Sequence, residues 1–276
     1  MANEAQQTEA TTTSSKNVVE MLVNSNILLV YLLGPNPPEE GLQMGILKKL
    51  AEYGQGDVTS RLTFIDTHRE VQSARLACTK GFKSLISDPE GYVTDGEFIE
   101  IVNQALIREA FHARQVGGKN GEKIFLVAGM PRNRSHAAEL CGRSTQKVKQ
   151  HCLHLDISYE TCLKRVLKRH KNGGKNSLLK YVDDNYRARK HDYRKYEMFA
   201  VPAISDIRRH KEKMVTTING DDTIENQTRR LILALGKIEA LNHRSLWALR
   251  DRLSDRRHPA HELIGAIDQE ELSTTQ

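Results

Sequence analysis

Short, uninterrupted runs of apolar residues recur along the chain and predict five β-strands. They cover residues 26–34 (NILLVYLLG), 62–66 (LTFID), 123–129 (KIFLVAG), 152–157 (CLHLDI) and 214–220 (MVTTING). Such runs are typical of a parallel sheet that is buried on both faces. Because helical segments separate the runs, we expect an α/β fold with helices on both faces of the sheet and ligands at the carboxyl ends of its strands.

Helical spacing of apolar residues follows two of these runs. After the first run, this spacing is found at Leu42, Ile46, Leu47 and Leu50. Short helices are expected between the second run and about residue 92. Beyond them, Asp95 is expected to cap a helix with one buried face, made of Phe98, Ile101, Val102, Ala105, Leu106 and Ala110.

Length and composition favour one compact domain with tails. The chain has 276 residues, of which 38% are hydrophobic. We expect residues 1–25 to form a disordered tail and residues 26–241 to form the domain. Within the domain, the segment 169–180 (RHKNGGKNSLLK) lacks an apolar face and predicts an exposed flap. Residues 242–276 predict a small amphipathic helix and a tail, the helix with a stripe of Leu246, Trp247, Leu249 and Leu253.

Charge, cysteines and hydropathy narrow the function classes only slightly. The net charge of +6 is compatible with phosphate-bearing ligands, with nucleic acid, or with no specific partner. Four dispersed cysteines without CxxC spacing indicate neither a disulfide framework nor a zinc site, and they favour a cytoplasmic protein. Since no apolar run approaches the roughly 20 residues of a membrane span, we expect no membrane partner.

A series of short motifs resembles the nucleoside monophosphate kinases, namely adenylate kinase and UMP-CMP kinase in their short-lid form. In chain order the motifs are GPNPPEEGLQ (34–43), GMPR (129–132), LDISYETCLKRVLKR (155–169), VDDN (182–185), YEMFAVP (196–202) and ING (218–220). This resemblance runs over residues 26–235. It implies a three-layer α/β/α fold of the P-loop type, with a five-stranded parallel sheet, a short lid and NMP-binding helices. It also implies phosphoryl transfer from ATP to a nucleoside monophosphate, assisted by Mg²⁺.

The expected phosphate-binding loop departs from the family pattern. Backbone N–H groups and a lysine normally hold the ATP phosphates there. In this chain the matching positions are Gly34, Glu40, Gly41 and Gln43, so a glutamate stands in place of the lysine. Three prolines in the loop, Pro35, Pro37 and Pro38, have no N–H to donate, and only the first of them has a counterpart in many members of the family. We therefore expect weak ATP binding, and the simplest interpretation of NPPEE is a solvated turn. A magnesium ion held on Glu39 or Glu40 is the alternative.

The resemblance implies a monophosphate site with some of its residues retained. Thr67 matches a threonine in a turn of that site, and Arg132 in GMPR matches an arginine that grips the phosphate. Gln72 replaces a second arginine, for which Arg75 is a candidate substitute. Arg132 either contacts a ligand or forms a surface salt bridge. His136 stands where the family has a base-reading glutamine, but we expect it to be an ordinary surface residue.

The lid region of residues 169–184 is similarly mixed. The positions that match the family, or that could supply charge, are Arg169, Lys180, Asp183 and Asp184. Tyr181 and Asp192 stand where arginines are expected. Losing one preorganised donor commonly lowers the rate by about 100- to 1,000-fold, so several losses predict slight activity.

Three functions follow as hypotheses. The first is a kinase-like protein with a degraded ATP site that acts as a binding or structural subunit, with Arg132 and Arg169 as the candidate catalytic remnants. The second is a divergent active kinase that uses ATP and Mg²⁺. The third is docking through the C-terminal segment, to RNA through its arginines or to a protein through its apolar stripe. The alternative for this segment is a helix that packs back on the domain through the same apolar residues.

Overall fold

The computed structural model describes residues 18–35, 47, 62–79, 86, 93–116, 123–145, 147–164 and 190–238. Several predictions concern positions outside these ranges. They include the loop residues Glu40, Gly41 and Gln43, the helix residues Leu42, Ile46 and Leu50, the lid residues Arg169, Lys180, Asp183 and Asp184, and the C-terminal segment 242–276.

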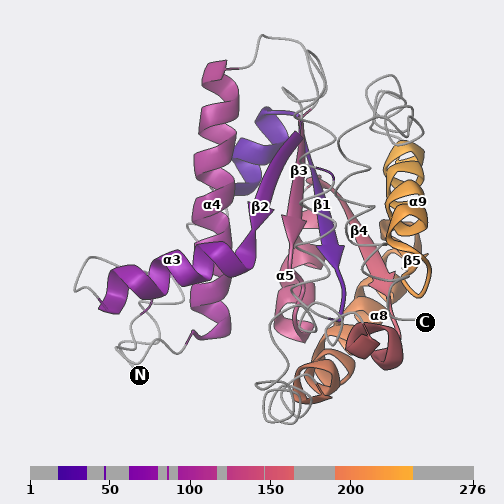
Figure 1. Cartoon of the computed structure of the whole chain (residues 1–276). Helices are drawn as coiled ribbons and strands as arrows, with labels where there is room; N and C mark the ends of the chain where they lie inside the picture. Colours follow the sequence, from indigo (N-terminus) through magenta and orange to yellow (C-terminus); the bar gives the residue numbers. More distant parts are fainter. Residues whose placement is uncertain are drawn as a thin grey trace, which may run out of the picture.

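The five predicted strands form one parallel sheet, in the order β2-β3-β1-β4-β5 (Figure 1). Their bounds are Ile27–Leu33 (β1), Leu62–Asp66 (β2), Lys123–Ala128 (β3), Lys149–Asp156 (β4) and Val215–Asn219 (β5). The expected α/β fold is therefore confirmed. Strand β4 begins three residues earlier than expected, because its polar start pairs with β1 at Lys149 opposite Leu28.

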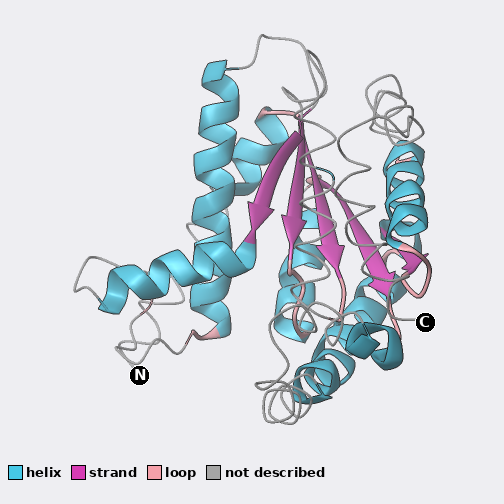
Figure 2. Cartoon of the chain, in the orientation of Figure 1, coloured by secondary structure: helices cyan, strands magenta, loops and turns pink. Residues whose placement is uncertain are grey.

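Two hydrophobic clusters, one on each face of the sheet, account for its burial on both sides. Alternate residues of β1 divide between the clusters: Leu28, Val30 and Leu32 belong to one, and Ile27, Leu29 and Tyr31 to the other. Helix α9 (Ile224–Lys237) contributes to the first cluster. The second cluster holds residues of α4 (Asp95–Val116), α5 (Arg134–Thr145) and α8 (Val201–His210). Figure 2 shows the strands between these helices, which makes three α/β/α layers.

Residues 18–24 form a short helix, which differs from the tail expected over residues 1–25. Val18 and Leu22 lie in the second hydrophobic cluster, with exposed fractions of 0% and 1%. Burial of these two side chains ties this segment to the domain.

Helix starts also differ from expectation in detail. Helix α3 (Thr67–Thr79) follows β2 without a break, and the rest of the segment in which short helices are expected lies outside the described residues, apart from Ile86. Asp66 caps it, since its Oδ1 accepts the backbone N–H groups of His68 and Arg69 at 3.0 and 3.3 Å. Helix α4 is capped by Thr94 rather than Asp95. The side chains of Thr94 and Glu97 exchange bonds with each other's backbone N–H, which is a capping box.

A buried polar cluster joins α5 to α4 and β1. The guanidinium of Arg143, 2% exposed, donates to Glu139 Oε1 at 3.1 Å, to the hydroxyl of Tyr31 at 3.3 Å and to Asn103 Oδ1. Burial raises the pKa of the Tyr31 phenol. These contacts satisfy a charge that would otherwise be costly to bury.

All four cysteines lie in described parts of the chain, and no disulfide joins them. Cys152 and Cys162 are buried, whereas Cys78 and Cys141 are half-buried. None of the described helices combines the length and the apolar content that crossing a membrane requires.

Candidate functional site

A cavity of about 910 Å³ lies at the carboxyl ends of β1, β2 and β3. This is the edge of a parallel sheet at which ligands normally bind. The described residues that line it are Leu33, Gly34, Pro35, Asp66, His68, Gly129, Pro131, Arg132, Asn133, Asp192, Lys195, Tyr196, Phe199 and Ala200. The predicted site residues Gly34 and Arg132 are therefore among its walls.

Strand β1 leads directly into the cavity through Gly34 and Pro35. A phosphate-binding loop in this place works through its backbone N–H groups. Pro35 has no N–H to donate to a ligand in the cavity.

Arg132 is held at the cavity by contacts from three segments. Its Nε donates to the carbonyl of Gly129 at 3.0 Å, and its Nη2 donates to Thr67 Oγ1 at 3.2 Å. Its Cζ lies 4.6 Å from the centre of the Phe98 ring. Gly129 has a φ of 85°, a left-handed conformation that suits glycine. The structure thus brings together Thr67 and Arg132, both expected at the monophosphate site.

His136 is buried, so the expectation of an ordinary surface residue is wrong. Its exposed fraction is 2%, and its ring stacks on Phe98 at 4.5 Å between centroids and 11° between planes. Nδ1 accepts the backbone N–H of Arg132 at 3.2 Å. The proton of the neutral ring therefore sits on Nε2, which lies 3.6 Å from Asp95 Oδ1.

Desolvation lowers the pKa of His136 to about 4, although the Asp95 carboxylate opposes the shift; Arg132 adds to it. The ring is therefore neutral near pH 7. It is absent from the described residues that line the cavity. Its contacts position Arg132 and the start of α5, and they do not support a base-reading role.

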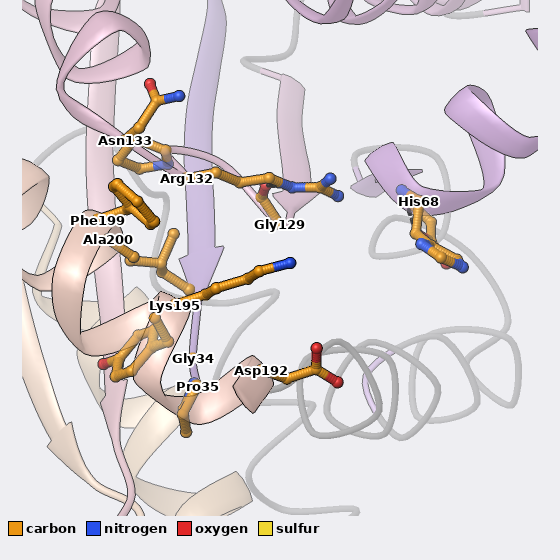
Figure 3. A pocket seen from close by; sticks show the side chains of 14 residues that line it. Gly34, Pro35, His68, Gly129, Arg132, Asn133, Asp192, Lys195, Phe199 and Ala200 are labelled. Atoms are coloured by element: carbon orange, nitrogen blue, oxygen red, sulfur yellow. Dashed lines mark hydrogen bonds between the residues drawn. The ribbon is translucent and has the colours of Figure 1, made fainter. Parts of the chain in front are cut away.

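Lys195 is a cavity residue that the motifs did not reveal. It immediately precedes η1 (Tyr196–Ala200), a single π-helical turn. Such turns are frequent at functional sites. In Figure 3 the side chains of Lys195 and Arg132 extend in the same direction, and the Asp192 carboxylate lies on the same side. The cavity-lining positions 192, 195, 196, 199 and 200 share one helical face, and that spacing was the available signal.

Tyr196 connects this helical face to the sheet. Its hydroxyl hydrogen-bonds with Nε2 of His154 on β4. Burial lowers the pKa of His154 to about 4, so this histidine is also neutral near pH 7. The contact orients η1, and with it Lys195 and Phe199, toward the cavity.

Arg75 does not lie among the described residues of the cavity wall. It is exposed on α3, eight residues after Thr67, which corresponds to about 12 Å along a helix. Since α3 runs away from the sheet (Figure 1), Arg75 is a poor substitute for the missing arginine.

Carboxylates also face the cavity. Asp66 and Asp192 both line it, and Mg²⁺ commonly binds through one or two carboxylates together with substrate phosphates. In the described ranges, no three His, Cys, Asp or Glu side chains gather closely enough to hold a metal ion by themselves. These two residues would hold Mg²⁺ only with the help of a bound phosphate.

No protein-family model matches this chain, and no curated protein matches it. Among solved structures, a shikimate kinase from Bacteroides thetaiotaomicron is similar at 13% sequence identity. The match covers 75% of this chain and 98% of that one, with a TM-score of 0.38. The α/β fold class follows from the five-stranded parallel sheet and its helical layers.

Proposed function

We propose that this protein is a nucleoside monophosphate kinase-like subunit that binds a monophosphate in the cavity but has a degraded ATP side. The observation that carries the proposal is Arg132, held by Gly129, Thr67 and Phe98 beside Lys195. A guanidinium fixed before the ligand arrives loses little conformational entropy on binding. Its planar donors suit the oxygens of a phosphate.

The charge of the cavity suits a monophosphate better than a triphosphate. Among the described lining residues, Arg132 and Lys195 supply two positive charges, and Asp66 and Asp192 supply two negative ones. Like charges about 4 Å apart repel by about 4 kcal/mol at an effective dielectric constant of about 20. Each phosphate group beyond the first would therefore bind less favourably, because the two carboxylates repel its negative charge.

The loop expected to hold the ATP phosphates offers fewer suitable donors than the monophosphate side at Arg132. In the sequence, Glu40 stands where the family has its lysine, and Pro37 and Pro38 have no N–H group to donate. Together these features support impaired or absent catalysis and a role in binding or structure.

One observation favours the alternative, a divergent active kinase. Lys195 places an ammonium group at the cavity from a position outside the phosphate loop, so it is a candidate replacement for the missing lysine. In that case ATP would be the phosphoryl donor. Asp66 and Asp192 would help to hold Mg²⁺ between its phosphates.

Calorimetric titration with AMP, UMP and CMP tests monophosphate binding. We expect binding by the wild type, with affinity at least tenfold weaker in Arg132→Met. The matched control is Arg134→Met, because Arg134 is exposed, pairs with Asp206 at 3.1 Å and is not among the described lining residues. Equal affinity in the two variants, or no binding by the wild type, would refute the monophosphate site.

A coupled assay of ADP production separates the two functions. Ordinary kinases turn over at about 1 to 100 per second. Turnover within a hundredfold of these rates, lost in Lys195→Met, would establish the active alternative. Binding of a monophosphate without turnover supports the degraded form.

A further inference from the structure

A second, basic hollow lies at the opposite edge of the sheet, where β4 and β5 begin. Its volume is about 520 Å³. The described residues that line it are Lys147, Val148, Lys149, Gln150, Lys211, Glu212, Lys213 and Met214. The described lining thus contains four lysines and one glutamate. Nothing in the proposed function uses this hollow.

The topology explains why these residues meet. Parallel pairing places Cys152 of β4 opposite Val215 of β5, so the residues that precede each strand reach the same edge of the sheet. Val148 and Met214 are buried and form an apolar floor. The four lysines are all exposed around it.

Helix termini account for only part of this positive charge. Helices α5 and α8 end just before the two lysine pairs, at Thr145 and His210. A helix C-terminus carries roughly half a negative charge, so two of them offer roughly one. The last turn of α8 already contains Arg208 and Arg209. The positive charge of the four lysines therefore exceeds the partial negative charge of the two helix termini.

Lys147 has a backbone conformation that favours glycine. Its φ is 65°, and the N–H of Val148 donates to the carbonyl of Arg143 at 3.3 Å. This bond is that of a Schellman motif, whose left-handed residue after the helix is most often glycine. A lysine there is less favourable for the fold than glycine.

We propose that the basic hollow binds the phosphate backbone of a nucleic acid without reading its sequence. Lysine ammonium groups act as point charges that accept phosphates in many geometries. A nucleic-acid strand carries one negative charge per 3.4 Å or so, a density that suits a compact group of four lysines. Among the lining residues that the structure describes, none has an aromatic side chain to stack on a base.

Fluorescence anisotropy with labelled 12-nucleotide oligouridylate and oligothymidylate tests this proposal over a range of salt concentrations. The four-lysine variant K147A/K149A/K211A/K213A should bind at least tenfold more weakly at low salt. For a single strand, losing four phosphate contacts should reduce the slope of log K against log salt by about 3. Lys190→Ala, an exposed lysine in the helix before the π-turn, should leave both values unchanged.

Lys147→Gly separates binding from stability. Because glycine suits the left-handed position, this variant should unfold at a higher temperature than the wild type and still bind the oligonucleotides more weakly. Unchanged affinity in Lys147→Gly and in the four-lysine variant would overturn the proposal. Displacement of the oligonucleotide by polyglutamate of equal length and at equal concentration would also overturn it, because it would show attraction to any polyanion.

Discussion

Acid should destabilise this protein through His136, and the size of the effect follows from its burial. The ring is 2% exposed and stacked on Phe98, and its pKa falls from 6.5 to about 4 in the folded chain. Between these two pH values the unfolded chain binds a proton at His136 and the folded chain does not. The free energy of unfolding therefore decreases as the pH falls through this window.

The size of the pKa shift of His136 sets how much stability is lost in acid. One pKa unit corresponds to about 1.4 kcal/mol. The free energy of unfolding therefore decreases by about 3 kcal/mol over the full window, and by about 2 to 3 kcal/mol when the pH is lowered to 4.5. His154, whose pKa is also lowered to about 4, acts in the same direction. Protonation of both histidines is therefore a substantial cost beside the roughly 5 to 15 kcal/mol that stabilises a typical domain.

Urea denaturation at pH 7.5 and pH 4.5 measures this effect. In His136→Gln, the difference in free energy of unfolding between the two pH values should be smaller than in the wild type by about 2 to 3 kcal/mol. Glutamine keeps an acceptor for the Arg132 N–H but does not titrate. His112→Gln, at an exposed position of α4, should retain the wild-type difference. If His136→Gln also retains it, our account of a buried neutral imidazole is refuted.

Two further predictions concern stability. Arg143→Met should lower the free energy of unfolding by about 3 kcal/mol in urea denaturation, because it leaves the buried oxygen of Asn103 without its donor; an unchanged midpoint would contradict the buried cluster. Gly220→Ala should destabilise the protein by about 1 to 3 kcal/mol, since a Cβ there would overlap with Cγ1 of Ile157. Its control is Gly142→Ala in α5, where nothing lies within 4 Å and a gain of up to about 1 kcal/mol is expected; equal thermal midpoints for the two variants would count against this packing.

Part of the candidate site was predictable from local sequence. Thr67 directly follows β2, and Arg132 lies four residues after β3. Because β2 and β3 are neighbours in a parallel sheet, residues beyond their carboxyl ends lie close together. Their hydrogen bond at 3.2 Å agrees with that placement.

Two features of the site were not predicted, the burial of His136 and the place of Lys195 at the cavity, and both have the same physical origin. His136 stands in a polar helical segment that carries no local sign of burial. Its cover is the ring of Phe98, 38 residues earlier in the chain. Likewise, Lys195 reaches the cavity because the π-turn after it is oriented by the contact between Tyr196 and His154 of β4. Neither outcome can be read from the neighbouring residues.

The sequence by itself determined which segments are strands, that the sheet is parallel, and that helices cover both of its faces. Apolar run length and helical spacing are local properties, and they carry that information directly. Only the tertiary structure decided that His136 is a buried neutral ring, that Lys195 joins Arg132 at the cavity, and that two pairs of lysines form one hollow. Burial, pKa and charge density depend on neighbours in space, and these come from segments far apart along the chain.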